Sequence, residues 1–366
     1  MGPLIVYTLV FIVTAALVPV INVAWLFNFT LGSLAVIGVC TALLTGGVFG
    51  LGALFPPIYT QALMAGQGLA GLVTSLASIF TLLAVKPDNT CGEDDSNDDA
   101  NNSCDPYSKV DWAAFSYFVV AVIMLLMCIV CYVILDKMPI TEYYRNRAKS
   151  NPTSVDIETN DAVQPLLDIV TDDDYNPAVS SERLRHVIGV VRGPATAVFL
   201  VFLVTLALFP TITGSIKSSK NCDDPDNRFQ NDLFIPVSFL LFNGGDLLGR
   251  SLAGKVDTTN EKGTRRILVI ASACRFVFFP LFLLCNVSST ILPVVFSNDF
   301  YPIAFMIVFA VSNGLTSTVC MMVGPSMVPA NEQEMAGNVM VFSLSSGLFM
   351  GSVVSFACLK IGTGKW

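Results

Sequence analysis

The sequence has little charge. Lys, Arg, Asp and Glu make up 13% of its 366 residues, whereas hydrophobic residues make up 53%. Soluble domains carry about 25% charged residues, so this chain lacks the polar side chains that a water-exposed surface of its size requires. The mean hydropathy of +0.66 agrees with this. Apolar runs of about 20 residues, enough to cross the hydrocarbon core of a bilayer, alternate with polar blocks. The composition predicts an all-α polytopic membrane protein that has the lipid bilayer as its surroundings.

Histidine is nearly absent as well, and basic residues are outnumbered. The single histidine, His186, lies in a polar stretch, which excludes His-based metal sites and Ser-His-Asp catalysis. A formal net charge of −8 excludes the basic face that nucleic-acid binding needs. The start at residues 1–4 lacks the basic segment of a cleaved signal peptide, and no ATP-binding motif is found. We therefore expect no enzyme, cofactor, metal, nucleic-acid partner or obligate protein partner.

The apolar segments predict nine membrane-spanning helices in two groups. They lie at roughly 3–22, 27–54, 59–85, 112–135, 194–215, 233–252, 266–286, 300–327 and 335–359. The first four form an expected N-terminal bundle within 1–135, and the other five form an expected C-terminal bundle within 193–366. The segment 136–192 between them is rich in Asp, Ser, Thr, Asn and Pro, which predicts a largely disordered loop.

Lysine and arginine collect in alternate loops, and this sets the expected orientation. Segments 136–192 and 253–265 are rich in them, whereas 86–111 has two lysines and eight acidic residues. Because positive loops stay on the inner side of the membrane, we expect the 136–192 loop to be cytosolic. Segment 86–111 and the C-terminus are then extracellular.

Modification signals fall in the loops expected outside. Asn101 and Asn286 each begin an N-glycosylation sequon, and acidic, sequon-bearing loops favour the plasma membrane. Cys91 and Cys104 flank the acidic loop, where oxidising conditions would allow a disulfide. Two free thiols in this loop are the alternative.

Two charged residues in one expected span are the strongest functional signal. Asp246 and Arg250 are one helical turn apart, and Phe239 and Asn243 extend the same face. Charges inside a membrane are costly and face partners or water. An aromatic ring, an amide, a carboxylate and a guanidinium together suit a flat base carrying a sugar. A structural ion pair, with Arg250 reaching the cytosolic interface, is the alternative. We favour the functional interpretation, because apolar residues can replace a structural pair at little loss.

Two further features have more than one interpretation. Arg275 lies inside the expected span 266–286, and Glu334 opens the last span from the cytosolic side. They could pair as a cytosolic gate or as a structural latch. The segment 66–71 spells G-x-G-x-x-G, a dinucleotide fingerprint, but it has no strand before it. Its glycines therefore predict close helix packing instead.

With these residues located, the chain resembles the equilibrative nucleoside transporter family. The matching segments are GGVFGL at 46–51, MAGQGLAG at 64–71, FIPVS at 234–238, FNGGDLLGRS at 242–251, RFVFFPL at 275–281, SNG at 312–314 and EMAG at 334–337. They occur in family order over nearly the whole chain. The resemblance implies a major-facilitator-like, two-bundle transporter of eleven helices with a large cytosolic loop. Nine of these helices are found here, and the missing ones are the first two.

The resemblance also implies a function and site residues. The function is facilitative transport of purine and pyrimidine nucleosides by alternating access. Asp246 and Arg250 would contact the nucleoside, with Asn243 and Phe239 nearby. The chain departs from the family at Thr45, where well-known members carry a glutamine that reads the base. Thr41 lies one turn earlier, where the family tunes inhibitor sensitivity. Gating or structural roles fall to Arg275, Glu334, Gly66 and Asn313.

Other functions stay open at this point. A nucleobase carrier or an organic-cation (monoamine) carrier belongs to the same family, but a cation carrier calls for an unpaired acid, and Asp246 has Arg250 beside it. The absence of two family helices also allows a truncated isoform that does not transport.

Overall fold

The computed structural model describes residues 2–17, 25–84, 112–149, 177–221, 227–258, 261–287 and 292–363. Helices account for most of them, and these ranges contain no strand. The only extended pairings in the same ranges are isolated bridges from Ile216 to Val287 and from Cys285 to Phe296. The expected all-α fold is confirmed.

The chain divides into two compact units, of which the first comprises Met1–Val48 and Glu93–Lys149. Its helices are α1 (Gly2–Leu17), the part of α2 (Trp25–Ala53) up to Val48, α4 (Trp112–Asp136) and α5 (Pro139–Lys149). Helix α1 packs against α4. A tight turn joins α4 to α5, where the Thr141 hydroxyl donates to the Leu135 carbonyl at 2.7 Å.

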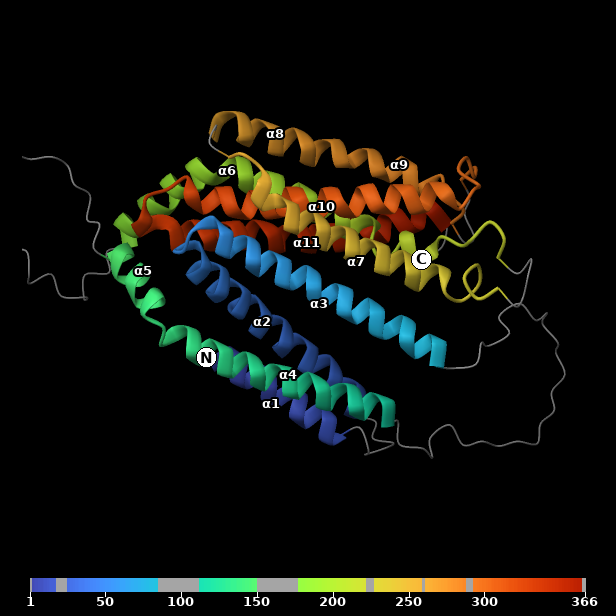
Figure 1. Cartoon of the computed structure of the whole chain (residues 1–366), viewed down its shortest axis with the longest axis horizontal. Helices are drawn as coiled ribbons and strands as arrows, with labels where there is room; N and C mark the ends of the chain where they lie inside the picture. Colours follow the sequence, from blue (N-terminus) through green and yellow to red (C-terminus); the bar gives the residue numbers. More distant parts are fainter. Residues whose placement is uncertain are drawn as a thin grey trace, which may run out of the picture. The chain divides into compact units, whose positions relative to one another are not determined.

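The second unit comprises Phe49–Gly92 and Ser150–Trp366. It contains the end of α2 and then α3 (Pro57–Ala84), α6 (Pro177–Leu208), α7 (Phe234–Leu252), α8 (Glu261–Cys274), the 3-10 turn η4 (Arg275–Val277), α9 (Phe278–Leu283), α10 (Phe300–Ser326), the 3-10 turn η5 (Ala330–Glu332) and α11 (Gln333–Thr363). Helix α6 packs along α11, α7 along α10, and α3 along α7. Figure 1 shows α10 and α11 in the middle of this unit, with α8 and α9 along one flank and α7 with α3 along the other.

Apolar side chains fill the second unit in two main clusters. One joins α3, α6, α10 and α11 and includes Met64, Val198, Met321 and Met340. The other is rich in aromatic rings and joins α6, α7, α9 and α10. In this aromatic cluster the ring of Phe309 lies 4.9 Å from that of Phe278 and 5.4 Å from that of Phe282, measured between centroids. The packing holds the middle of α7 against α10, where the polar residues of the site lie.

Seven helical stretches in the described ranges are long and apolar enough to cross a membrane. They lie in α2, α3, α4, α6, the α8–α9 pair, α10 and α11. The other two expected spans are helical too, but α1 is shorter, and α7 is less apolar because it carries Asn243, Asp246 and Arg250. The protein is a polytopic membrane protein.

Helices occupy both ends of the 136–192 segment, which the sequence predicts to be a largely disordered loop. Helix α5 occupies Pro139–Lys149, and α6 already begins at Pro177. The start of α6 is amphipathic, because Val187 and Val191 are buried against Val328 and Ala336 while charged side chains occupy its other faces. A search for long apolar runs overlooks such a helix. Residues 150–176 lie outside the described ranges.

The compact units also follow different boundaries from the expected bundles 1–135 and 193–366. Helix α3 belongs to the second unit because its glycine-rich face packs on α7. The two bundles stay a prediction.

Candidate functional site

Asp246 and Arg250 form a buried ion pair near the end of α7. The Arg250 Nε donates to Asp246 Oδ2 at 2.7 Å, and the residues are 4% and 6% exposed. The other carboxylate oxygen, Oδ1, accepts a hydrogen bond of 2.7 Å from Asn313 Nδ2 on α10. Both oxygens of the carboxylate are therefore engaged, as burial of a charge requires.

The Nη1 atom of Arg250, which does not bond to Asp246, reaches α3. This atom donates to the Met64 carbonyl at 2.9 Å and to Gln67 Oε1 at 3.2 Å. Nearby, Gln61 Nε2 donates to the backbone carbonyls of Arg250 and Ser251 at 3.1 and 2.9 Å. Helix α3 thus supplies neutral acceptors to the cation and fastens the end of α7.

Asn243 and Phe239 continue the same face of α7, as the spacing predicts. The Asn243 amide donates to Ser75 Oγ on α3 at 2.7 Å and to the Phe239 carbonyl at 3.0 Å. The Phe239 ring meets the ring of Phe209 edge to face, with 5.0 Å between centroids. Both residues are half-buried. The face offers an aromatic plate, an amide, a carboxylate and a guanidinium in one row.

Arg275 joins this network from another side. It opens η4, is 2% exposed, and donates through Nη1 to the Phe309 carbonyl at 2.9 Å and to the Ser312 hydroxyl. Its Nη2 donates to Thr205 Oγ1 at 2.9 Å and to Asn313 Oδ1 at 3.4 Å. The guanidinium carbon lies 4.6 Å from the centroid of the Phe309 ring, a cation–π contact. Asn313 therefore links Arg275 to Asp246.

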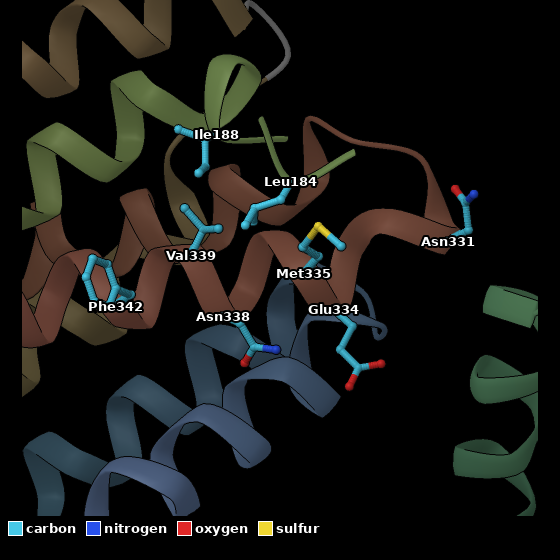
Figure 2. A pocket seen from close by; sticks show the side chains of 8 residues that line it. All are labelled: Leu184, Ile188, Asn331, Glu334, Met335, Asn338, Val339 and Phe342. Atoms are coloured by element: carbon cyan, nitrogen blue, oxygen red, sulfur yellow. The ribbon is translucent and has the colours of Figure 1, made fainter. Parts of the chain in front are cut away.

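Glu334 lies apart from Arg275, at the start of α11. It lines a groove of about 600 Å³ between α6 and α11, shown in Figure 2. The groove is lined by Leu184, Ile188, Asn331, Glu334, Met335, Asn338, Val339 and Phe342. Glu334 and Asn338 point toward the end of α2, where both side chains approach Gly50. No ion pair among the described residues joins Glu334 to Arg275, so the pairing considered from the sequence is absent here.

The glycines of segment 64–71 differ in what they contact. A Cβ on Gly66 would meet no atom within 4 Å. A Cβ on Gly68 would lie 3.1 Å from Arg250 Cδ, and one on Gly71 would overlap the Asn243 side chain. Close packing against α7 therefore involves Gly68 and Gly71, and Gly66 takes no part in it.

The remaining predicted residues lie outside this network. Thr41 and Thr45 are on α2 in the first unit, Thr41 exposed and Thr45 half-buried. Asn101, Cys91 and Cys104 lie outside the described residues. Asn286 donates through Nδ2, the atom that would carry a glycan, to the carbonyls of Lys217 and Ser218 at 3.2 and 3.4 Å.

Sequence reasoning missed the uncharged partners. Thr205 is a single hydroxyl residue in an apolar run, and Ser75 follows Thr74 in another; such residues commonly bond to their own helix. Gln67 had a stronger signal, since an amide inside a membrane-spanning segment needs a partner there. Nothing in the sequence identified those partners.

Comparison with known proteins shows the family of the chain. Residues 31–359 match the family model described as nucleoside transporter. Equilibrative nucleoside transporter 1 of Rattus norvegicus is 34% identical over 375 residues, which cover 97% of this chain and 74% of the relative. The human protein of the same name is 33% identical over 367 residues, with the same coverage of both chains.

A second type of relative gives the same result. Equilibrative nucleoside transporter 2 of Mus musculus is 32% identical over 378 residues, covering 97% of this chain and 77% of the relative. Four of the segments that carried the resemblance, at 64–71, 242–251, 275–281 and 312–314, supply residues of the hydrogen-bond network around α7. The chain belongs to the nucleoside transporter family.

Proposed function

We propose that this chain carries nucleosides across a membrane down their concentration gradient. The observation that carries the proposal is the buried Asp246–Arg250 pair on the polar face of α7. Burying such a pair costs desolvation that apolar residues would avoid, so a role in recognition explains its presence. Membership of a family whose relatives are named equilibrative nucleoside transporters supports the substrate class.

The α7 face matches the chemistry of a nucleoside. Sugar hydroxyls donate to a carboxylate and accept from a guanidinium, which Asp246 and Arg250 supply. A flat base stacks on an aromatic ring and bonds to an amide, which Phe239 and Asn243 supply.

Substrate binding at this face exchanges hydrogen bonds. In this structure Arg250 Nη1 is bonded to the Met64 carbonyl and Gln67. A nucleoside that accepts hydrogen bonds from Arg250 replaces the neutral acceptors of α3. The total number of hydrogen bonds then changes little. We infer that such an exchange loosens the contact between α3 and α7 during alternating access.

The remaining expectations become part of the proposal. We propose that the 136–192 segment is cytosolic, that 86–111 and the C-terminus are extracellular, and that the host is the plasma membrane. Thr45 and Thr41 belong to the substrate path in this proposal, and Asn101 and Asn286 are its glycosylation sites. The basic loops and the family resemblance support these assignments.

Uptake of labelled uridine into vesicles that contain only this chain tests the proposal. We expect saturable flux for the wild type and loss of more than about ten-fold for Asp246→Asn and Arg250→Ala, because each removes one member of a buried pair. Asp232→Asn is the matched control, since Asp232 pairs with Arg228 at the same spacing but outside the α7 face. It should leave the uridine KM unchanged.

Each contrary result has a specific meaning. Normal uptake by Asp246→Asn at equal membrane abundance would remove the pair from the binding site. No flux in the wild type above empty vesicles would favour the truncated, non-transporting isoform. A monoamine carrier is disfavoured because the negative charge of Asp246 is already paired with Arg250.

A further inference from the structure

A continuous chain of hydrogen bonds connects Arg275 to Asp246 through four elements. Arg275 on η4 donates from Nη2 to Thr205 Oγ1 on α6 at 2.9 Å. Thr205 Oγ1 lies 2.7 Å from Asn313 Oδ1 on α10. Asn313 then donates from Nδ2 to Asp246 Oδ1 on α7 at 2.7 Å. We call Arg275, Thr205 and Asn313 the relay.

The relay has one direction because a guanidinium only donates. Arg275 Nη2 presents a donor to Asn313 Oδ1 at 3.4 Å. The single Thr205 hydroxyl proton has two acceptors at 2.7 Å, the Val201 carbonyl in its own helix and Asn313 Oδ1. A reversed amide would turn its NH2 group toward the guanidinium and its oxygen toward the Asp246 carboxylate, and both contacts would be repulsive. Asn313 therefore presents an N–H to Asp246, and Asp246 Oδ1 acts as an acceptor.

Backbone contact between α7 and α10 fixes the position of Asn313 relative to Asp246. A Cβ on Gly314, next to Asn313, would overlap the backbone carbonyl of Asp246. A Cβ on Gly249 would overlap the carbonyl of Val311. Because the two backbones touch at these glycines, Asn313 and Asp246 cannot slide past each other without separating the helices.

Arg275 makes a poor structural residue on its own. It is fully surrounded by protein, no carboxylate among the described residues pairs with it, and its Nε has no hydrogen-bond partner. An unpaired buried cation of this kind is costly. Its position is explained if its charge and donors act on Asp246 through Asn313 and Thr205.

We propose that the relay positions Asp246 for sugar recognition, and that Thr205 and Arg275 are positioning residues for substrates with sugar hydroxyls. This inference rests on the proposed function. With Oδ1 held by Asn313 and Oδ2 by Arg250, the plane of the carboxylate is fixed, and the remaining lone pairs accept sugar hydroxyls in one orientation. A nucleoside without the 2′- and 3′-hydroxyls makes no use of the relay.

The test compares uridine with 2′,3′-dideoxyuridine in vesicles containing the purified chain. Thr205→Val removes the hydroxyl at nearly constant shape, and Thr205→Ser retains it. We expect Thr205→Val to raise the uridine KM about five-fold, the value of one net hydrogen bond. Thr205→Ser should stay within about two-fold of the wild type, since its hydroxyl can make the same bonds. The KM of dideoxyuridine should be the same in all three proteins.

Two further variants secure the test. Arg275→Lys retains the charge but loses the planar fork, so it should raise the uridine KM while leaving that of dideoxyuridine unchanged. It provides the readout if Thr205→Val does not reach the membrane. Thr211→Val is the matched control, because Thr211 bonds to Ser355 away from the relay. It should leave both KM values unchanged.

The possible failures can be told apart. An equal rise of both KM values, or failure of Thr205→Ser to restore uridine transport, would show a general packing role and overturn the relay. Unchanged KM values in Thr205→Val and Arg275→Lys would also overturn the relay, while uridine transport that depends on Asp246 would leave the proposed function intact. No saturable uridine flux in the wild type would overturn both.

Discussion

At the scale of single residues, the matching of hydrogen-bond donors and acceptors defines the site. Two guanidiniums, Arg250 and Arg275, lie near one carboxylate, Asp246, and neutral groups of α3, α6 and α10 accept hydrogen bonds from their other arms, while Arg275 Nε has no partner among the described residues. A substrate that enters this set must offer acceptors to Arg250 and donors to Asp246. A nucleoside offers both, which is why the exchange of partners is central to the proposed mechanism.

The acceptor at Gln67 provides a test of this exchange. Gln67→Glu places a carboxylate about where Oε1 now lies, 3.2 Å from Arg250 Nη1. Charge-assisted hydrogen bonds are roughly twice as strong as neutral ones, so the new carboxylate should compete with substrate and raise the uridine KM about ten-fold. Gln67→Leu, which lacks an acceptor, is the control and should not raise it. Equal KM values in the two variants, measured by vesicle uptake, would contradict the exchange.

The prediction for Thr45 concerns recognition of the base and not of the sugar. Thr45→Gln introduces a longer side chain with an amide, which can bond to the edge of a base that the shorter threonine does not reach. The variant should therefore change the ratio of adenosine to uridine uptake. An unchanged ratio at equal membrane abundance would show that position 45 does not read the base.

At the scale of helices, α7 has two different neighbours. Toward α10 the two backbones touch, because a Cβ on Gly314 or Gly249 would overlap a carbonyl oxygen of the other helix. Toward α3 the backbones are less close, because a Cβ on Gly68 would lie 3.2 Å from the Leu247 Cα, and side-chain hydrogen bonds make the other contacts. Backbone contact leaves no room for relative movement, and side-chain hydrogen bonds can be exchanged. We therefore expect α7 and α10 to move together and the contact with α3 to change during transport.

Substitution of the glycines tests the α7–α10 contact. Gly314→Ala places a Cβ against the Asp246 carbonyl, and Gly66→Ala places one in open space. Overpacking a tight contact costs about 1–3 kcal/mol or more, whereas Gly→Ala in an open helix position stabilises the helix. Gly314→Ala should therefore lower the thermal stability of the detergent-purified chain, and Gly66→Ala should preserve it. Equal melting temperatures of the two variants would show that the helices can separate at little cost.

At the scale of the whole molecule, the charge in the loops predicts the orientation. Basic residues lie on both sides of the 150–176 segment and in the 253–265 turn, and acidic residues dominate 86–111. The α8–α9 pair, joined by η4, supplies one apolar stretch and counts as one crossing. This count supports the proposal that the 86–111 segment and the C-terminus lie on the same outer side.

Labelling with a membrane-impermeant thiol reagent on intact cells checks the orientation. Cys104 should react from outside under reducing conditions, and a cysteine introduced by Ser154→Cys should react only after permeabilisation, because positive loops remain inside. Removal of Cys104 by Cys104→Ser provides the background. Reaction of Ser154→Cys on intact cells, with Cys104 protected, would invert the topology.

Much of the fold and part of the site could be predicted from the sequence. Long apolar runs identified the membrane helices because length and hydropathy are local properties. The turn-by-turn spacing of Phe239, Asn243, Asp246 and Arg250 predicted one face of α7, since a helix repeats every 3.6 residues. The extension of α6 to Pro177 was missed because its apolar stripe is narrow and lies among charged residues.

The helical membrane class, the family and the row of functional groups on α7 could be inferred from the sequence, because each depends on residues close together in the chain. Which helices supply hydrogen-bond partners to that row depends on the tertiary packing. Gln67, Thr205, Asn313 and Arg275 come from four separate elements, and their hydrogen bonds to α7 or to one another depend on how the helices cross. At Gly249 and Gly314 the backbone of the neighbouring helix lies against the glycine, whereas Gly66 faces open space.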